Sequence, residues 1–262
     1  MKYKFFCALL ALMLGCAGLI AAPMAVHNVK GDWYDVETDF YRCSFYVGCM
    51  YPVWFASADG KIEFPRGFLL DWIKLADAPD TQLHYLHEDL FAEVTILENT
   101  DSKLVAECVG KFCKSNVAFP GVTARYRWTL QRNSPEILLE AQVSFDDNAP
   151  RTMCRINFGS LAFRNRPFEL VKVGNGEWQP FRVAGEAPKV FRSPQGVMLQ
   201  MENKMKIGIT TSACAWNNNF DRFFTYVSHV GSDKNNLWNG QQPYSFTMKF
   251  KVEGNVTQGA AN

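Results

Sequence analysis

The chain has almost no excess of charge of either sign, and this absence is the first limit on its function. Its 27 Lys and Arg residues against 26 Asp and Glu residues leave a formal net charge of +1, and no basic block stands out. Nucleic-acid-binding proteins usually carry a basic patch or stripe, because their affinity comes largely from neutralising phosphates. We therefore expect no nucleic-acid partner.

Motifs for several common kinds of chemistry are missing as well. The sequence has no G-x-S-x-G, which would present a nucleophilic serine, and no glycine-rich loop of the kind that binds phosphate. It also lacks paired C-x2-C units, so a structural zinc site is not expected. We predict neither a metal nor a cofactor.

Long apolar runs are absent except at residues 5–20, which follow two lysines and precede three alanines. This order is typical of a secretory signal peptide, and the run is short for a spanning helix, which needs about 20 apolar residues. Met13-Leu14-Gly15-Cys16 also loosely resembles the box before a lipidated cysteine. We predict a signal peptide at residues 1–25 and an exported chain, periplasmic or extracellular. A lipid anchor at Cys16 is the alternative, and it is the only membrane attachment that we expect.

Six cysteines lie beyond that leader: Cys43, Cys49, Cys108, Cys113, Cys154 and Cys214. An oxidising compartment would allow disulfides, and Cys43/Cys49 and Cys108/Cys113 are close enough in sequence to close small loops. Cysteine is also among the most buried residue types, so several of the six are equally explained as free thiols in a core. Both interpretations stay open.

Residues 122–145 alternate between apolar and polar side chains with hardly an interruption. Val122, Tyr126 and Trp128 point one way, whereas Arg125 and Arg127 point the other. A turn at 132–135 separates this run from a second one, 137–145, with the same alternation. Because strand side chains project to opposite faces with a period of two, we predict an antiparallel hairpin with one buried and one wet face.

Similar patterns recur along the chain. The further strands that we expect cover residues 33–47 (with a bend or bulge near 40–41), 51–56, 90–98, 103–114, 153–163, 168–173, 177–183, 189–192, 197–202, 206–211, 223–230 and 244–252. Only residues 67–78 have a pattern that would suit a short helix. About a dozen strands with few helices predict an all-β fold, either two stacked antiparallel sheets or a barrel. We expect one domain at 26–253 and a disordered tail at 254–262.

The run Trp33-Tyr34-Asp35-Val36-Glu37-Thr38-Asp39-Phe40-Tyr41-Arg42 resembles the opening strands of the galactose mutarotase-like β-supersandwich. Arg125-Tyr126-Arg127-Trp128-Thr129-Leu130, with the strand at 136–143, resembles a later hairpin of that superfamily. The resemblance implies a large antiparallel sandwich and a link to carbohydrates. Known members include sugar mutarotases and domains attached to polysaccharide lyases and glycoside hydrolases.

The catalytic residues of that superfamily cannot be carried over to this chain. Mutarotases present a histidine acid and a glutamate base, but no recognisable motif surrounds His27, His84, His87 or His229. On a helix, His84 and His87 would share a face, yet the order His84-Tyr85-Leu86-His87-Glu88 is neither H-E-x-x-H nor H-x-x-E-H. We interpret it as a solvated loop or helix face and leave the catalytic residues unassigned.

Candidate sugar-binding residues come from two kinds of sequence. Aromatic planes beside amides and charges suit the apolar C–H faces and the hydroxyls of a sugar, and arginines on a wet sheet face suit acidic sugars. The residues that meet these criteria are Trp216, Asn217, Asn219, Arg222, Trp238, Arg125 and Arg127. The plainer interpretation is that the asparagines form turns, the tryptophans fill a core and the arginines face solvent.

Three functions remain open at this stage. The first is an exported carbohydrate-binding or accessory β-sandwich in polysaccharide handling, with an oligo- or polysaccharide as partner. The second is a sugar-active enzyme (an epimerase, lyase or hydrolase) on the same sheets, because paired carboxylates leave no local motif. The third is a structural envelope protein that binds another protein, for which an exposed apolar patch would be expected.

Overall fold

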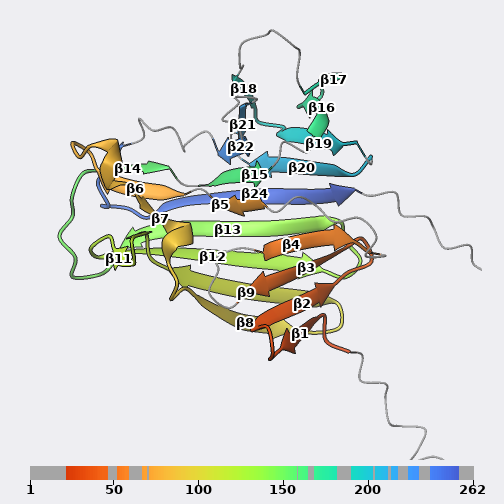
Figure 1. The fold of residues 1–262 in the computed structure, drawn as a ribbon, viewed down its shortest axis with the longest axis horizontal. Coiled ribbons are helices and arrows are strands. Elements are labelled where there is room, and N and C mark those ends of the chain that lie inside the picture. The colour runs from red at the N-terminus through yellow and green to blue at the C-terminus, as the bar shows by residue number, and fades with distance from the viewer. Residues whose placement is uncertain are drawn as a thin grey trace, which may run out of the picture.

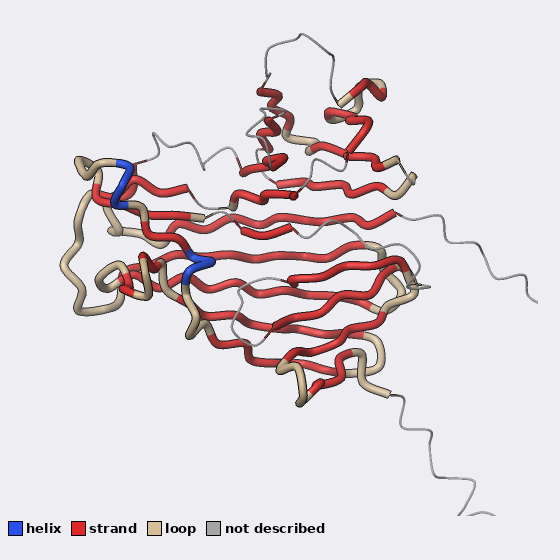
Figure 2. The backbone as a smooth tube through the Cα atoms, in the orientation of Figure 1, coloured by secondary structure: helices blue, strands red, loops and turns tan. Residues whose placement is uncertain are grey.

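The computed structural model describes residues 22–46, 52–58, 67–69, 71–157, 159–164, 168–181, 190–202, 204–211, 214–217, 224–229 and 237–253. Strands make up nearly all regular structure in these ranges (Figures 1 and 2). The helices found there, η1 (Asp80–Gln82) and η2 (Leu86–Glu88), are single 3-10 turns. No helix in the described part of the chain has the length and hydropathy needed to cross a membrane. The predicted all-β fold is confirmed.

The largest sheet has nine strands in the order β17-β16-β19-β20-β24-β13-β12-β9-β8. Their bounds are β17 (Trp178–Pro180), β16 (Phe168–Val173), β19 (Val197–Met201), β20 (Lys206–Thr211), β24 (Tyr244–Glu253), β13 (Glu136–Phe145), β12 (Val122–Gln131), β9 (Lys103–Gly110) and β8 (Glu93–Asn99). All neighbouring strands in it run antiparallel. The hairpins predicted at 122–145 and 197–211 belong to this sheet, as does the hairpin predicted at 90–114 up to Gly110, whereas residues 113–114 pair in another sheet.

Three smaller sheets complete the fold. In Figure 1 the four-stranded sheet, in the order β1-β2-β3-β4, lies in front of part of the nine-stranded sheet. Its bounds are β1 (Ala25–Asn28), β2 (Trp33–Glu37), β3 (Tyr41–Tyr46) and β4 (Pro52–Ser57). A six-stranded sheet contains β11 (Val117–Ala118), β10 (Cys113–Lys114), β7 (His84–Tyr85), β6 (Trp72–Leu75), β14 (Cys154–Asn157) and β23 (Leu237–Trp238), in that order. A five-stranded sheet contains β18 (Val190–Ser193), β21 (Cys214–Asn217), β22 (Phe224–His229), β15 (Ser160–Arg164) and β5 (Gly67–Leu69).

Two local predictions need correction. The change of phase near residues 40–41 is not a bend within one strand but the complete reversal between β2 and β3. The hydroxyl of Thr38 makes this turn, because it accepts the N–H groups of Phe40 at 3.2 Å and Tyr41 at 3.0 Å. The short helix predicted at 67–78 is wrong, since this segment contributes β5 and β6 to two different sheets.

The cysteines whose side chains are described are all buried and none of them forms a disulfide: Cys43, Cys108, Cys113 and Cys154. The Cys108/Cys113 disulfide, one of the two close pairings considered, is therefore absent. Cys49 and the side chain of Cys214 lie outside the described residues. Burial raises the pKa of Cys113 to about 11, so this thiol is protonated at neutral pH and packs as a small apolar group.

Aromatic contacts join the four-stranded sheet to the nine-stranded one. Phe45 of β3 meets the ring of Trp128 of β12 edge-on at 6.2 Å, and Trp128 meets Phe250 of β24 at 5.7 Å. Trp128 is 2% exposed and Phe45 is fully buried. Burial of each such side chain stabilises the fold by about 1.5–3 kcal/mol relative to exposure. The apolar faces of the two sheets therefore form one continuous core.

A buried carboxylate ties the nine-stranded sheet to the loops at one end of the molecule. Asp71 is 0% exposed, and its Oδ1 accepts the backbone N–H of Gly159 at 2.8 Å. Its Oδ2 accepts a hydrogen bond from the hydroxyl of Tyr126, and its carbonyl accepts the N–H of Leu86 at 3.0 Å. Burial and the neighbouring Asp71 raise the pKa of Tyr126 well above its usual value, which keeps the hydroxyl a donor.

Tyr126→Phe removes one donor from Asp71 with little change of volume. Because a buried polar group then loses a partner, we expect the free energy of unfolding to fall by about 1–3 kcal/mol. Urea denaturation followed by tryptophan fluorescence measures this. Tyr46→Phe, at a side chain 43% exposed, is the control and should change stability by less than about 0.5 kcal/mol. Equal midpoints for Tyr126→Phe and wild type would contradict the role given to this bond.

Candidate functional site

Two arginines of β12 form the centre of the site. Arg125 and Arg127 are two residues apart in one strand, so they project from the same face, opposite to the core residues Tyr126 and Trp128. Their side chains are 49% and 48% exposed. Both predicted residues therefore lie on the outer face of the nine-stranded sheet.

A single carboxylate on the neighbouring strand β9 holds both guanidinium groups. Glu107 lies opposite Arg127, and its side chain is only 12% exposed. Its Oε1 pairs with Nη1 of Arg125 at 2.5 Å, and its Oε2 pairs with Nη2 of Arg127 at 3.0 Å. Because each arginine uses one of its terminal nitrogens in these pairs, several N–H donors remain on each guanidinium, in fixed positions.

A shallow groove of about 400 Å³ runs over this face. We call it the sheet groove, and the residues that line it are Arg125, Arg127, Glu140, Ala141, Gln142, Ser245, Phe246 and Thr247. The strand register explains how these residues meet. Gln142 of β13 lies between Arg125 of β12 and Ser245 of β24, and Glu140 lies one row further, between Arg127 and Thr247.

The sheet groove offers every kind of hydrogen-bonding group that a hydroxyl-rich ligand needs. The arginines only donate, the carboxylate of Glu140 only accepts, and the amide and hydroxyl groups do both. Gln142 already donates to Ser245 at 3.4 Å, which aligns two of these groups. The two positive charges of the arginines are balanced by Glu107 and Glu140, so the groove is polar but has no net charge. It suits neutral hydroxyls better than an anion.

The other predicted binding residues do not join this groove. Trp238 is 6% exposed: its ring stacks on Phe145 at 4.8 Å, and its Nε1 donates to the carbonyl of Gln242 at 2.8 Å. Its ring is thus part of the core. Trp216 and Asn217 belong to β21 through their backbone, but their side chains lie outside the described residues, as do Asn219 and Arg222 entirely.

Sequence reasoning missed Glu107, Ser245 and Thr247 as site residues. The wet-face alternation at 136–143 contains Glu140 and Gln142, so these two could have been found once the hairpin register was drawn. Ser245 reaches the groove only because β24 pairs with β13, and 103 residues separate it from Gln142. No local pattern in the sequence indicates that pairing.

The two histidines of the cluster at 84–88 contact different neighbours. His84 lies in β7, its Nδ1 is 3.1 Å from the carbonyl of Gln82, and its ring meets Phe119 edge-on at 5.3 Å. His87 belongs to η2, and its ring lies 5.1 Å from that of Tyr85. Nowhere in the described ranges do three or more His, Cys, Asp or Glu side chains gather as metal ligands would.

Desolvation lowers the pKa of both His84 and His87 below the ordinary value of 6.5. For His84, the positive charge of Lys114 lowers the pKa further, while the Gln82 carbonyl and Glu88 raise it. The unfolded chain therefore binds more protons than the folded one just below pH 6.5. The stability that the two neutral imidazoles contribute is complete above pH 6.5, and it declines as the pH falls towards their lowered pKa values.

We expect the double variant His84→Gln/His87→Gln to lose less stability than wild type between pH 7.5 and pH 5.5. Urea midpoints at the two pH values measure this, and background titration of carboxylates is common to both proteins. A wild-type loss no larger than that of the double variant would show that these imidazoles do not titrate with folding.

Comparison with known proteins bears on the fold. No protein-family model matches the chain, and no curated protein matches it by sequence. An α-mannosidase from Enterococcus faecalis superposes with a TM-score of 0.59 and 12% identity over 89% of this chain and 30% of its own. An α-galactosidase from Geobacillus stearothermophilus gives 0.54 and 8% over 85% and 40% of the two chains. A galactose mutarotase related enzyme from Lactobacillus acidophilus gives 0.50 and 10% over 85% and 97%.

The chain has the galactose mutarotase-like sandwich fold. The resemblance noted from the runs at 33–42 and 125–130 is thereby confirmed. Identities of this size establish the galactose mutarotase-like fold alone, because one fold supports many functions. The chain also spans less than half the length of the two glycosidases that it matches.

Proposed function

We propose that this protein is an exported carbohydrate-binding β-sandwich and that the sheet groove binds a neutral saccharide. The observation that carries the proposal is the pair Arg125 and Arg127, fixed by Glu107 beside Glu140 and Gln142. Export rests on the apolar run at residues 5–20 and its flanking residues.

Pre-positioned polar groups explain how a shallow groove can bind a sugar. A hydrogen bond to a charged group contributes about 1.5–3 kcal/mol, and a neutral one contributes about 0.5–1.5 kcal/mol. Glu107 already orders both arginine side chains, so less conformational entropy is lost when a ligand binds. A few such bonds from Arg125, Arg127, Glu140 and Gln142 would give an affinity typical of an accessory binding domain.

The balance of charge favours a neutral sugar over an acidic one. A uronic acid or sulfated sugar would gain from two unpaired guanidinium groups, but Glu107 uses one terminal nitrogen of each. Glu140 adds a second negative charge to the same row. The names of two structural neighbours, an α-mannosidase and an α-galactosidase, refer to neutral sugars and also support the proposal.

Arg127→Ala removes donors from the middle of the sheet groove. We expect it to weaken binding of neutral oligosaccharides at least about tenfold, since tenfold corresponds to about 1.4 kcal/mol. Isothermal titration with cellohexaose, maltohexaose, mannohexaose and xylohexaose measures this, with hexagalacturonate as the acidic comparison. Tighter binding of hexagalacturonate than of every neutral hexaose would contradict the neutral specificity.

Lys204→Ala is the matched control. Lys204 is a cation on the turn between β19 and β20, its side chain is 61% exposed, and it does not line the groove. This variant should bind like wild type. If neither Arg127→Ala nor Gln142→Ala changes binding, the groove is not the site, and if no oligosaccharide binds at all, a structural envelope role becomes the better explanation.

A sugar-active enzyme is the second candidate, and one observation favours it. Glu107 and Glu140 flank Arg127 on strands two positions apart, about 10 Å between their backbones. Glycosidases place two carboxyl groups about 5–9.5 Å apart. Binding ranks first because Glu107 is engaged by two guanidinium groups and the groove is too shallow to exclude water. Release of reducing sugar by wild type but not by Glu140→Gln would reverse this order.

A further inference from the structure

The outer face of the four-stranded sheet carries a second set of features that would suit a sugar. Trp33, Asp35 and Glu37 of β2 alternate with the buried Val36, and Tyr46, Ser44 and Arg42 of β3 lie directly opposite them. The core residue Phe45 points the other way, towards Trp128. This face therefore looks away from the sheet groove, on the other side of the sandwich.

Trp33 and Tyr46, which we call the aromatic platform, are cross-strand partners in the register of β2 and β3. Side chains in such positions have Cβ atoms about 4.5–5.5 Å apart, so the two rings present neighbouring surfaces. Tyr46 is 43% exposed and Trp33 is partly exposed. Exposed aromatic surface of this kind is what the apolar C–H face of a sugar ring requires.

The Trp33 ring is held in place from two directions. Its Nε1 donates to Oδ2 of Asp35 at 2.9 Å, while Oδ1 of Asp35 accepts the hydroxyl of Ser44 at 2.7 Å. The backbone of Gly31, in the turn between β1 and β2, lies against the ring so closely that any Cβ at this position would overlap it. The ring therefore loses little freedom when a ligand stacks on it.

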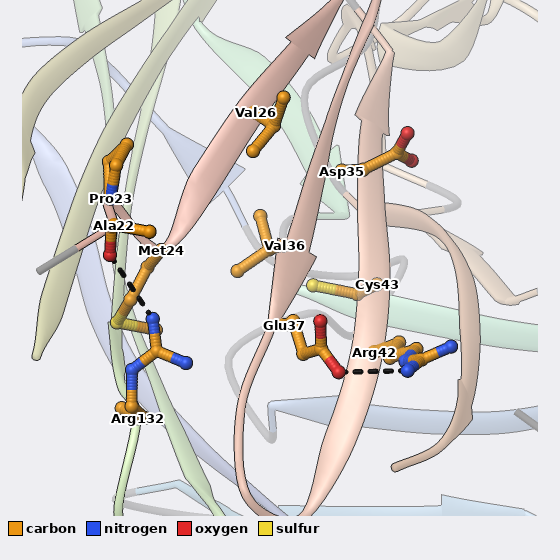
Figure 3. Close-up of a pocket in the computed structure, with 10 residues that line it drawn as sticks. All are labelled: Ala22, Pro23, Met24, Val26, Asp35, Val36, Glu37, Arg42, Cys43 and Arg132. Carbon is orange, nitrogen blue, oxygen red and sulfur yellow. Dashed lines mark hydrogen bonds and ion pairs between the residues drawn. The ribbon is translucent and has the colours of Figure 1, made fainter. Parts of the chain in front are cut away.

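A cavity of about 500 Å³ lies further along the same two strands: Asp35, Glu37 and Arg42 line it, whereas Trp33 and Tyr46 do not. In Figure 3, Pro23, Met24 and Arg132 line one side of it, Glu37 and Arg42 the other, and the valines lie between them. We call this the hairpin cavity. Its volume is within the range of about 300–1,000 Å³ that is usual for small-molecule sites.

The charges of the hairpin cavity cancel as they do in the sheet groove. Asp35 and Glu37 balance Arg42 and Arg132, and Arg42 pairs with Glu37 at 2.8 Å. The Nε–H of Arg42 is buried and has no hydrogen-bond partner among the residues that the structure describes. A ligand hydroxyl in the cavity would supply the acceptor that this donor lacks.

We propose that the aromatic platform is a second saccharide site, in which one sugar ring stacks on Trp33 and Tyr46 and the rest of the ligand follows the outer face of β2 and β3 towards Glu37 and Arg42 at the rim of the hairpin cavity. The ligand class is a neutral oligosaccharide, because the site combines exposed aromatic surface, both kinds of hydrogen-bonding group and no net charge. This site does not depend on the sheet groove, since the two occupy opposite outer faces.

The indole N–H of Trp33 reports on this site alone. Protein labelled with ¹⁵N-tryptophan has seven indole signals, and Trp33→Phe identifies the one that belongs to Trp33. In a titration with cellohexaose, maltohexaose, mannohexaose and xylohexaose, we expect that signal to shift saturably with at least one sugar. The shift should persist in Arg127→Ala and in Tyr46→Phe, and it should be lost in Tyr46→Ala.

Val29→Ala is the control, because Val29 is 78% exposed in the turn between β1 and β2 and does not line the cavity. It should leave the shift unchanged. A Trp33 signal that no sugar moves, alongside binding that Arg127→Ala abolishes, overturns the second site and leaves the sheet groove intact. A Trp33 shift without any effect of Arg127→Ala keeps the second site and rejects the groove. If no sugar shifts the Trp33 signal and Arg127→Ala has no effect on binding, both the second site and the sheet groove are rejected.

Discussion

The register that pairs β12 with β9 and β13 is the constraint on which the rest of the structure depends. It places Trp128 and Tyr126 in the core and Arg125 and Arg127 outside. A slip by one residue would exchange the two sets, burying two guanidinium groups and exposing two aromatic rings. The cost of burying an unpaired charge is far greater than that of any surface rearrangement. The register that buries the core side chains therefore also brings Glu107 opposite Arg127, so core packing determines the arrangement of the sheet groove.

Much of this arrangement follows from local sequence. The hairpin at 122–145 was predictable because both of its strands, its turn and its alternation lie within one short segment. The helix prediction for the segment 67–78 was wrong because its apolar residues, among them Leu69, Trp72 and Ile73, fit the spacing of a helix as well as that of two short strands. Only the pairing of these strands with their neighbours in two sheets decides between the alternatives. The cysteines at 108 and 113 were ambiguous for a related reason, since proximity in sequence says nothing of whether two thiols face each other.

The residues of the candidate sites differ in the same way in how far the sequence could predict them. Arg125 and Arg127 were visible as a pair on a wet face, whereas the restraint that Glu107 imposes on them comes from a strand about 20 residues away and only appears with the register. Trp238 illustrates the opposite error: a tryptophan among polar residues reads as a binding residue, yet its ring completes the core against Phe145. Trp33 was read only as part of a family-like run, because its exposure depends on Tyr46 across the hairpin and on the absence of a side chain at Gly31.

Two saccharide sites on opposite faces of one sandwich could not be occupied by the same short ligand. Stacked sheets are about 10 Å apart, with a close-packed core between them, so no ligand can pass from one face to the other through the molecule. A single short oligosaccharide cannot reach both sites, and the gain in effective concentration that linked sites give is then lost. The two sites would instead engage separate chains, or distant parts of one long chain. Two such sites would therefore make the protein a bridge between polysaccharide strands and would not strengthen its hold on a single short chain.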